Sequence, residues 1–386
     1  MKRALVALAT ALSLMTSVVP MAGAGQSEGG LSTDNVEWVA HVPFEVGTAT
    51  GARVIGKYLY VTTWRSFSIY DVSNPEAPEL LSITPFLGND GDPSPIKFEN
   101  EDVATNGEIM IFSEELPDSV LHVWNVEDKT APVQIASLIG AGQHTMSCIL
   151  DCKWLYGSDG SIVDLRKPTK PKLMKEKWGD DMPAGNSGHD VTEVAPGLVL
   201  TSTNPMMFLD ARKDPRNPKL LAISEQMTGF VHSNQWPNNA KDRWALSTGE
   251  TWVPGADAVC DENSAGFSTH DTSGYKKTGS FKLVDTYVMK GGTYADGSPA
   301  INAPFGCSSH WFQQHSTFEN GGLVAAGFYN HGTRFLDISS KGKIKEVGWF
   351  LPHGGGTSAA YWLSNRIVYA VDYQRGIDVL KYNGKF

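Results

Sequence analysis

The chain has 386 residues, a net charge of −10 at pH 7 and 19% charged residues. An acidic chain lacks the basic surface that nucleic acids require, so a nucleic-acid partner is excluded. Its 39 glycines and 21 prolines separate short apolar runs, which is typical of strands joined by turns.

The N-terminus predicts export. Residues 1–24 start with a basic pair, continue apolar to Met21 and end on Ala22-Gly23-Ala24. This order is typical of a secretory signal peptide cleaved after Ala24, with an N-terminal membrane anchor as the alternative. Residues 25–35 are polar and glycine-rich and predict a flexible leader. No later stretch is apolar and long enough to span a bilayer, so we expect no transmembrane segment after cleavage and a secreted or cell-surface protein.

Residues 36–386 predict a single domain built from one repeated unit. The clearest copy covers residues 188–224 and holds four short extended segments separated by turn residues. Further copies precede and follow it, and a period of about 40–45 residues with four strands per repeat is typical of a β-propeller. A pair of β-sandwiches would not explain this period.

The two ends of the domain complement each other. The seventh repeat, near 366–380, lacks a fourth strand, while Val36–Phe44 looks like a fourth strand without its repeat. Pairing them closes a ring and covers strand edges that would otherwise be exposed. The sequence therefore predicts an all-β fold, a seven-bladed β-propeller of four-stranded antiparallel blades closed by an N-terminal strand on the last blade.

Most repeats end their third strand on a short acidic or amide side chain. Such side chains accept hydrogen bonds from backbone N–H groups two residues further on, so we expect turn formation rather than catalysis. The residues concerned are Asp71, Asn125, Asp164, Asp210, Asp271, Asp337 and Asp378.

Several segments around these turns resemble one known repeat family. The matching pieces are IYDVSNPEAPELL (69–81), SIVDLRKPTKPKL (161–173) and FLDARKDPRNPKLL (208–221), with FLDIS (335–339) as a partial copy. They resemble the LVIVD-repeat family of β-propellers. The resemblance implies the propeller fold and an extracellular or surface location, and it implies no particular reaction.

Histidines recur where the first, innermost strand of a repeat is expected to begin. His144, His189, His232 and His315 hold this position in successive repeats, and Glu101 holds it in repeat two. Neighbouring blades would then direct these side chains to one level of the channel. Neutral imidazole is a common ligand of copper and zinc, so four of them predict a site for one such ion, with Glu101 as a ligand or general base. The alternative is that these histidines satisfy backbone groups or bind a ligand.

Other polar and aromatic residues are expected in loops on the same end of the propeller, which we call the upper face. Aromatic, arginine and histidine side chains in a cup suit an anionic or sugar-like ligand. The ligand-binding candidates are Trp64, Arg65, His310, His331, Arg334, His353 and Arg375.

The four cysteines of an exported protein predict disulfides. Cys148 and Cys152 flank a short turn and can bridge the two arms of a hairpin, which leaves Cys260 and Cys307 for each other. Three pairings are possible, and spacing favours this one.

The sequence leaves open whether the chain is an enzyme. It contains no Walker loop, no G-x-G-x-x-G, no G-x-S-x-G elbow and no H-E-x-x-H motif. The leading hypothesis is an exported propeller that binds an extracellular protein or small-molecule ligand at its histidine-rich upper face. The alternative is a copper- or zinc-dependent enzyme, an oxidoreductase, whose centre is the histidine cup.

Overall fold

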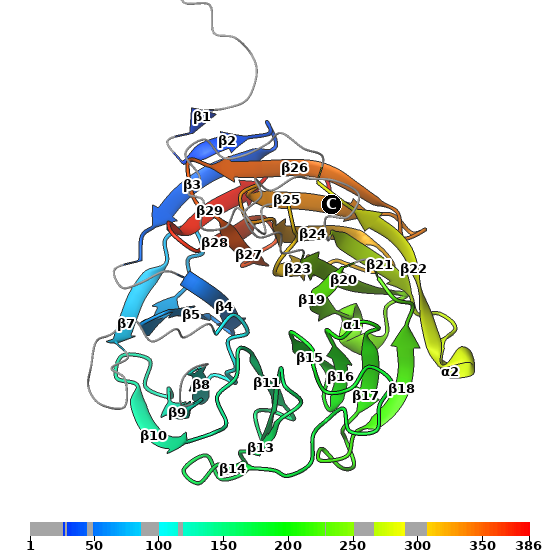
Figure 1. The fold of residues 1–386 in the computed structure, drawn as a ribbon. Helices are drawn as coiled ribbons and strands as arrows, with labels where there is room; N and C mark the ends of the chain where they lie inside the picture. The colour runs from blue at the N-terminus through cyan, green and yellow to red at the C-terminus, as the bar shows by residue number, and fades with distance from the viewer. Residues whose placement is uncertain are drawn as a thin grey trace, which may run out of the picture.

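The protein is all-β, and its sheets are arranged in a ring around a common centre (Figure 1). The structure is a computed structural model, and it describes residues 26–27, 29–44, 49–85, 100–114, 119–227, 229–250, 266–289 and 307–386. Two short helical turns occur among these residues, α1 (Pro237–Ala240) and α2 (Tyr275–Thr278). No helix in the described ranges is long and apolar enough to cross a bilayer.

The first three sheets follow the repeats in chain order, and in each of them consecutive strands pair antiparallel. Their strands are β4 (Ala49–Ile55), β5 (Tyr58–Thr63), β6 (Ser66–Asp71) and β7 (Glu79–Pro85); β8 (Ile109–Ser113), β9 (Leu121–Asn125) and β10 (Val133–Leu138); and β11 (Met146–Ile149), β12 (Trp154–Gly157), β13 (Ile162–Asp164) and β14 (Lys172–Leu173). The second sheet has three strands, because its expected innermost strand is reduced to one bridge between Thr105 and Met110.

The next two repeats form two four-stranded antiparallel units that share one continuous sheet. Their outer strands, β18 and β22, pair parallel through Ile223 with Ser280 and Ser224 with Phe281. The strands are β15 (Val191–Ala195), β16 (Leu198–Thr201), β17 (Met207–Asp210) and β18 (Lys219–Ser224), followed by β19 (Phe230–Gln235), β20 (Trp244–Glu250), β21 (Phe267–Asp271) and β22 (Ser280–Tyr287).

The following sheet corrects the expectation for residues 25–35. Part of this segment forms β1 (Gln26–Ser27) and β2 (Gly30–Ser32), and β2 pairs with the outer strand of the sheet, Leu31 opposite Leu351. The physical reason is that this outer edge offers free backbone groups, which a nearby extended segment satisfies. The sheet itself consists of β23 (Phe312–Gln314), β24 (Gly322–Gly327), β25 (Thr333–Ile338) and β26 (Ile344–Pro352).

The last sheet closes the ring as the sequence predicts. It contains β27 (Thr357–Trp362), β28 (Ile367–Asp372) and β29 (Gly376–Tyr382), and its fourth strand is the N-terminal β3 (Val36–Val42). Val36 lies opposite Tyr382, and Val42 lies opposite Ile377. In Figure 1 the blue β3 lies beside the red β29, so the N-terminal and C-terminal strands of the domain pair within one sheet.

The predicted turn chemistry is confirmed in five repeats. The side-chain oxygen accepts a hydrogen bond of 2.8–3.1 Å from the backbone N–H two residues on at Asp71, Asn125, Asp164, Asp210 and Asp271. Asp378 is different, and the expectation for it was wrong. It lies inside β29 and is 1% exposed, and its carboxylate accepts bonds from Trp38, His41 and Arg375.

The hydrophobic core lies between successive sheets. One cluster packs Leu59 and Val61 of the first sheet against Tyr369 and Val379 of the last. Other clusters join each remaining sheet or four-stranded unit to the next in the same way. Each unit is therefore stabilised by its two neighbours, as expected of a repeat that cannot bury both faces alone.

The disulfide predicted between Cys148 and Cys152 is confirmed. It spans the turn after β11, at the end of that strand away from His144. Cys260, which was predicted to pair with Cys307, and the predicted signal peptide of residues 1–24 lie outside the described residues.

Candidate metal centre

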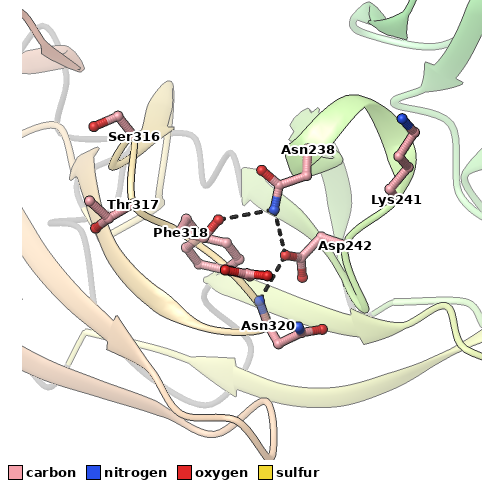
Figure 2. A pocket seen from close by; sticks show the side chains of 8 residues that line it. Asn238, Lys241, Asp242, Ser316, Thr317, Phe318 and Asn320 are labelled. Carbon is pink, nitrogen blue, oxygen red and sulfur yellow. Dashed lines mark hydrogen bonds between the residues drawn. The ribbon is translucent and has the colours of Figure 1, made fainter.

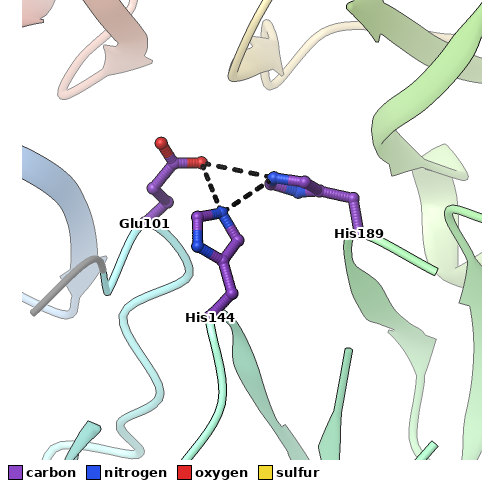
Figure 3. Close-up of side chains that lie close together, drawn as sticks. All are labelled: Glu101, His144 and His189. Atoms are coloured by element: carbon purple, nitrogen blue, oxygen red, sulfur yellow. Dashed lines mark hydrogen bonds and ion pairs between the residues drawn. The ribbon is translucent and has the colours of Figure 1, made fainter. Parts of the chain in front are cut away.

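Four imidazoles surround one carboxylate oxygen at the centre of the ring. Oε2 of Glu101 lies 3.2 Å from Nε2 of His232, 3.3 Å from Nε2 of His310, 3.9 Å from Nε2 of His189 and 4.0 Å from Nε2 of His144. Nε2 of His144 and Nε2 of His189 are 2.9 Å apart. Figure 3 shows how the side chains of Glu101, His144 and His189 converge from three separate segments.

The innermost strands position the histidines. His144 and His189 each lie two residues before an inner strand, β11 and β15, while His232 lies within β19 and His310 lies two residues before β23. These strands come from successive units and surround the centre of the ring in Figure 1. A side chain at the same end of each strand therefore reaches the same level of the axis.

Glu101 is held without a regular strand. The neighbouring Asn100 replaces the missing inner strand, because its side chain accepts a bond of 2.6 Å from the N–H of Ser113 and donates one of 3.1 Å to the carbonyl of Ser113. The Thr62 hydroxyl donates to the carbonyl of Asn100 at 2.7 Å. Gly51 in β4 lies so close to the backbone of Glu101 that a Cβ there would clash with it.

A second layer of groups orients the cluster. Oδ2 of Asp190, a fully buried residue, lies 3.3 Å from Nδ1 of His189 and 3.9 Å from Nδ1 of His232. The carbonyl of Ser358 accepts a bond of 2.6 Å from Nδ1 of His310, which leaves Nε2 of that ring with its lone pair free to act as a ligand. Such partners fix the ring orientation and tautomer of metal-binding histidines.

Two tyrosines and a second glutamate lie beside the cluster. The hydroxyl of Tyr373 donates to Oε1 of Glu101, and the hydroxyl of Tyr329 donates to Oε1 of Glu250 at the end of β20. The two tyrosine rings are parallel, and the ring of His310 packs against Tyr329 with 4.6 Å between centroids. Glu250 forms a further group of potential ligands with His189 and His232.

Burial and the neighbouring charged groups shift the pKa values of the cluster in opposite directions. Burial alone would raise the pKa of Glu101, but its interactions with His310 and His232 hold that pKa well below its usual range. Burial works against the charged form of His310, yet the nearby Glu101 and Glu250 raise the pKa of this ring above its ordinary value. Burial lowers the pKa of His189 to about 4 and that of His232 well below its usual range.

The same atoms lack hydrogen-bond partners. Oε2 of Glu101, both ring nitrogens of His232 and Nε2 of His310 are buried and make no hydrogen bond, although they lie close together. Buried polar atoms without partners are costly and rare in native proteins, so each calls for an explanation such as an ion. Imidazole nitrogens with one carboxylate oxygen are ligands that zinc and copper accept.

The structure brings together three of the four histidines that the sequence analysis predicted as metal ligands, His144, His189 and His232, with Glu101. His315 lies elsewhere, which corrects its predicted place. It follows the end of β23, its Nδ1 lies 2.7 Å from the Thr317 hydroxyl, and its ring packs against Trp362 and Phe386. The reason is that β23 starts three residues before His315, which puts His310 at the axial end of the strand.

The remaining ligand-binding candidates have varied surroundings. Arg375 donates to the Asp378 carboxylate and to the carbonyl of His353, so it serves to hold the turn. His353 and Arg65 are exposed, Trp64 is half-buried, and His331 is fully buried. Arg334 is 3% exposed and lies 3.4 Å from Glu346, while its Nε and Nη2 atoms have no hydrogen-bond partner.

A separate pocket is lined by residues of the segments that follow β19 and β23, among them Asn238, Asp242 and Phe318 (Figure 2). Its volume is about 310 Å³, and Asp242 lies at its wall. The Asp242 carboxylate accepts bonds from the side chain of Asn238 at 2.9 Å and from the N–H groups of Asn320 and Trp244 at 2.8 and 2.9 Å. These bonds tie Asp242 to the surrounding loops, and among the described residues that line the pocket there is no group of three potential metal ligands.

Sequence reasoning missed Glu250 and Asp190, and it placed His310 among loop residues. Asp190 directly follows His189, and a carboxylate beside a predicted ligand is a signal that could have been used. Glu250 offered no such signal, because it ends a second strand and reaches the centre only through the pairing of β20 with β19.

Comparison with known proteins agrees with this fold. Residues 46–84 match the family model described as LVIVD repeat, and no curated protein sequence matches the chain. Similar solved structures include the RRP9 WD40 repeats, with a TM-score of 0.58, 9% identity and coverage of 92% of this chain and 99% of that one. U3-55K gives a TM-score of 0.58 at 9% identity, covering 90% and 98%.

A functionally unknown protein from Desulfotomaculum acetoxidans DSM 771 has a TM-score of 0.54 at 9% identity, with coverage of 82% of this chain and 91% of that chain. At such identities the likeness concerns the fold alone. Residues 46–84 therefore match an LVIVD repeat, and the ring of antiparallel sheets shows that the chain has a β-propeller fold.

Proposed function

We propose that this protein is an exported, seven-bladed propeller whose function depends on a transition-metal ion bound by the axial histidine cluster. The observation that carries the proposal is the set of buried, unpartnered ligand atoms on Glu101, His232 and His310. Export is supported by the signal-like residues 1–24. The seven-blade assignment is supported by the seven apolar clusters, each of which joins two successive units.

The donor set favours zinc or copper, because both bind neutral imidazole together with carboxylate. Copper would supply electron-transfer chemistry and zinc would supply Lewis acidity. A cavity of about 150 Å³ reaches Glu101 and is also lined by Arg53, Asp102, Gln314 and Tyr361. Its size and polar lining suit a small polar substrate, and we propose an oxidoreductase as the enzyme class when the ion is copper.

The test is elemental analysis of the purified mature protein, alongside a His189→Ala, His232→Ala double variant. At least one equivalent of copper or zinc per chain is expected in the parent and none in the double variant. His315→Ala is the matched control, because this histidine is buried but lies outside the cluster, and it should keep the metal. No metal in the parent after incubation with Cu²⁺ and Zn²⁺ would overturn the proposal.

A second candidate function is ligand binding next to β25. The guanidinium of Arg334 keeps two buried nitrogens without hydrogen-bond partners. A buried cation with free donors suits a small carboxylate or phosphate. Thermal shift with acetate and phosphate should raise the Tm of the parent and leave that of Arg334→Gln unchanged, and an equal shift in both would rule this site out.

A further inference from the structure

The ligand atoms at the axis form two groups that share one residue. Glu101 belongs to a triad with His144 and His189 and to a second triad with His232 and His310. In each triad the ligand atoms lie within 4.8 Å of one another. Oε2 of Glu101 lies 3.2–4.0 Å from the four Nε2 atoms, and the Nε2 atoms of His144 and His189 lie 2.9 Å apart.

The four rings follow one another in a row. The centroid distances are 4.7 Å from His144 to His189, 3.9 Å from His189 to His232, and 4.0 Å from His232 to His310. Ligands about 2.1 Å from one ion lie at most about 4.2 Å from each other. Among the described residues, the ligand atoms that lie within 4.8 Å of one another form one group of Glu101 with His144 and His189 and another of Glu101 with His232 and His310. No such group contains all four rings, so two ions match the row better than one.

Two further carboxylates, those of Asp190 and Glu250, lie close to histidines of both triads. Asp190 faces Nδ1 of His189 in the first triad and Nδ1 of His232 in the second, at 3.3 and 3.9 Å. Glu250 forms a third group with these same two histidines. Two ligating carboxylates and four imidazoles give each of two divalent ions at least three protein ligands, with room for solvent or substrate.

We propose that the cluster is a dinuclear centre in which the carboxylate of Glu101 bridges two divalent transition-metal ions. His144 and His189 bind one ion, and His232 and His310 bind the other. Glu250 lies beside the inner pair of rings and completes the coordination. Two ions held about 3.5–4 Å apart can clamp a small ligand that has two oxygen atoms, which is the class of substrate or inhibitor this site would take. The inference rests on the proposed metal-binding function and adds the number and arrangement of the ions.

The experiment is a calorimetric titration of metal-free mature protein with Zn²⁺. Elemental analysis of the desalted product then gives the number of zinc ions bound per chain. The parent should bind two equivalents. His144→Ala and His310→Ala should each keep one, and Glu101→Gln should weaken both sites at least a hundredfold. His315→Ala should bind two equivalents, and circular dichroism with thermal melting verifies that every variant is folded.

The outcomes separate this inference from the proposed function. No zinc and no copper in the parent would overturn both. One equivalent in the parent, lost in both His144→Ala and His310→Ala, would overturn the dinuclear centre and leave the metal-binding function standing. Loading with two equivalents of Cu²⁺ gives an independent measurement, because two bridged Cu²⁺ ions should show a spin count below two by electron paramagnetic resonance. A full count of two isolated spins would overturn the bridge through Glu101.

Discussion

Oε2 of Glu101 lies 3.2 Å from Nε2 of His232, and neither of these buried atoms has a hydrogen-bond partner. The two residues come from different units of the ring and meet only at its axis. Leaving polar groups buried and unpaired costs about 1–3 kcal/mol for each group. The metal-free cluster is therefore a local weakness of the fold, and an ion that binds there should stabilise the folded state.

The first prediction concerns removal of the metal. Dialysis against a chelator should lower the Tm, and Zn²⁺ at about 1,000 times its dissociation constant should restore about 4 kcal/mol of unfolding free energy. Denaturant unfolding with and without Zn²⁺ measures this difference. The His189→Ala, His232→Ala protein should show no response to Zn²⁺, and an equal response in that protein would place the stabilising ion elsewhere.

The second prediction compares two histidines that are close in sequence. His310→Ala should lower the affinity of the Zn²⁺ site that it shares with His232 at least a hundredfold, because its Nε2 faces Glu101 at 3.3 Å, and the ion held by His144 and His189 should remain. His315→Ala should leave the affinity within about twofold and reduce stability by about 1–3 kcal/mol, because its ring packs against Trp362 and Phe386. Calorimetry and chemical denaturation of both variants test this, and loss of binding in His315→Ala alone would reverse the assignment.

The third prediction concerns the support of Glu101 by Gly51. A methyl group at this position would clash with the backbone of Glu101, so Gly51→Ala should displace the carboxylate and weaken Zn²⁺ binding at least tenfold. Gly274→Ala is the matched control, since a Cβ there would meet only Thr278 at 3.9 Å. Equal affinities in the two variants would show that Gly51 does not position the site.

The fourth prediction is a pH dependence at Asp372. Burial raises the pKa of this carboxyl from 3.8 to about 6, although the N–H groups of Gln374 and Arg375 partly oppose the shift. The folded state therefore binds a proton more tightly than the unfolded state does. Stability contributed by the protonated form is present below about pH 4 and is lost as the pH rises to about 6.

Asp372→Asn retains an oxygen for both N–H groups and cannot ionise. Relative to the parent, this variant should gain up to about 3 kcal/mol of unfolding free energy between pH 4 and pH 7. Urea unfolding of both proteins at four pH values gives the difference directly, and groups that titrate in both proteins cancel. A difference that stays constant with pH would contradict the prediction.

The fifth prediction concerns closure of the ring. Asp378 is 1% exposed and joins Trp38 and His41 of β3 to Arg375, so Asp378→Ala should cost about 3–5 kcal/mol by leaving these donors unpaired. Asp164→Ala removes a carboxylate paired with the largely exposed Arg166 and should cost at most about 1 kcal/mol. Chemical denaturation measures both, and similar costs would mean that Asp378 does not stabilise the closure.

Much of the fold could be predicted from the sequence because its determinants are local. Short apolar runs define strands, turn residues separate them, and five aspartate or asparagine side chains bond to the N–H two residues on, as predicted. The pairing of β3 with β29 was also predictable, since one repeat lacked a strand and the N-terminus supplied one. Residues 30–32 were misjudged, because their strand depends on the distant edge of β26 and not on a local pattern.

The candidate site was only partly predictable. The sequence alone determined that histidines recur where inner strands are expected to begin and that Glu101 holds the equivalent position in repeat two, because repeat spacing fixes which end of a unit a residue occupies. The tertiary structure alone decided that His310 and not His315 reaches the axis, since this depends on where β23 begins. It also decided that Glu250 and Asp190 join the cluster, because only ring closure brings side chains from separate units to one point.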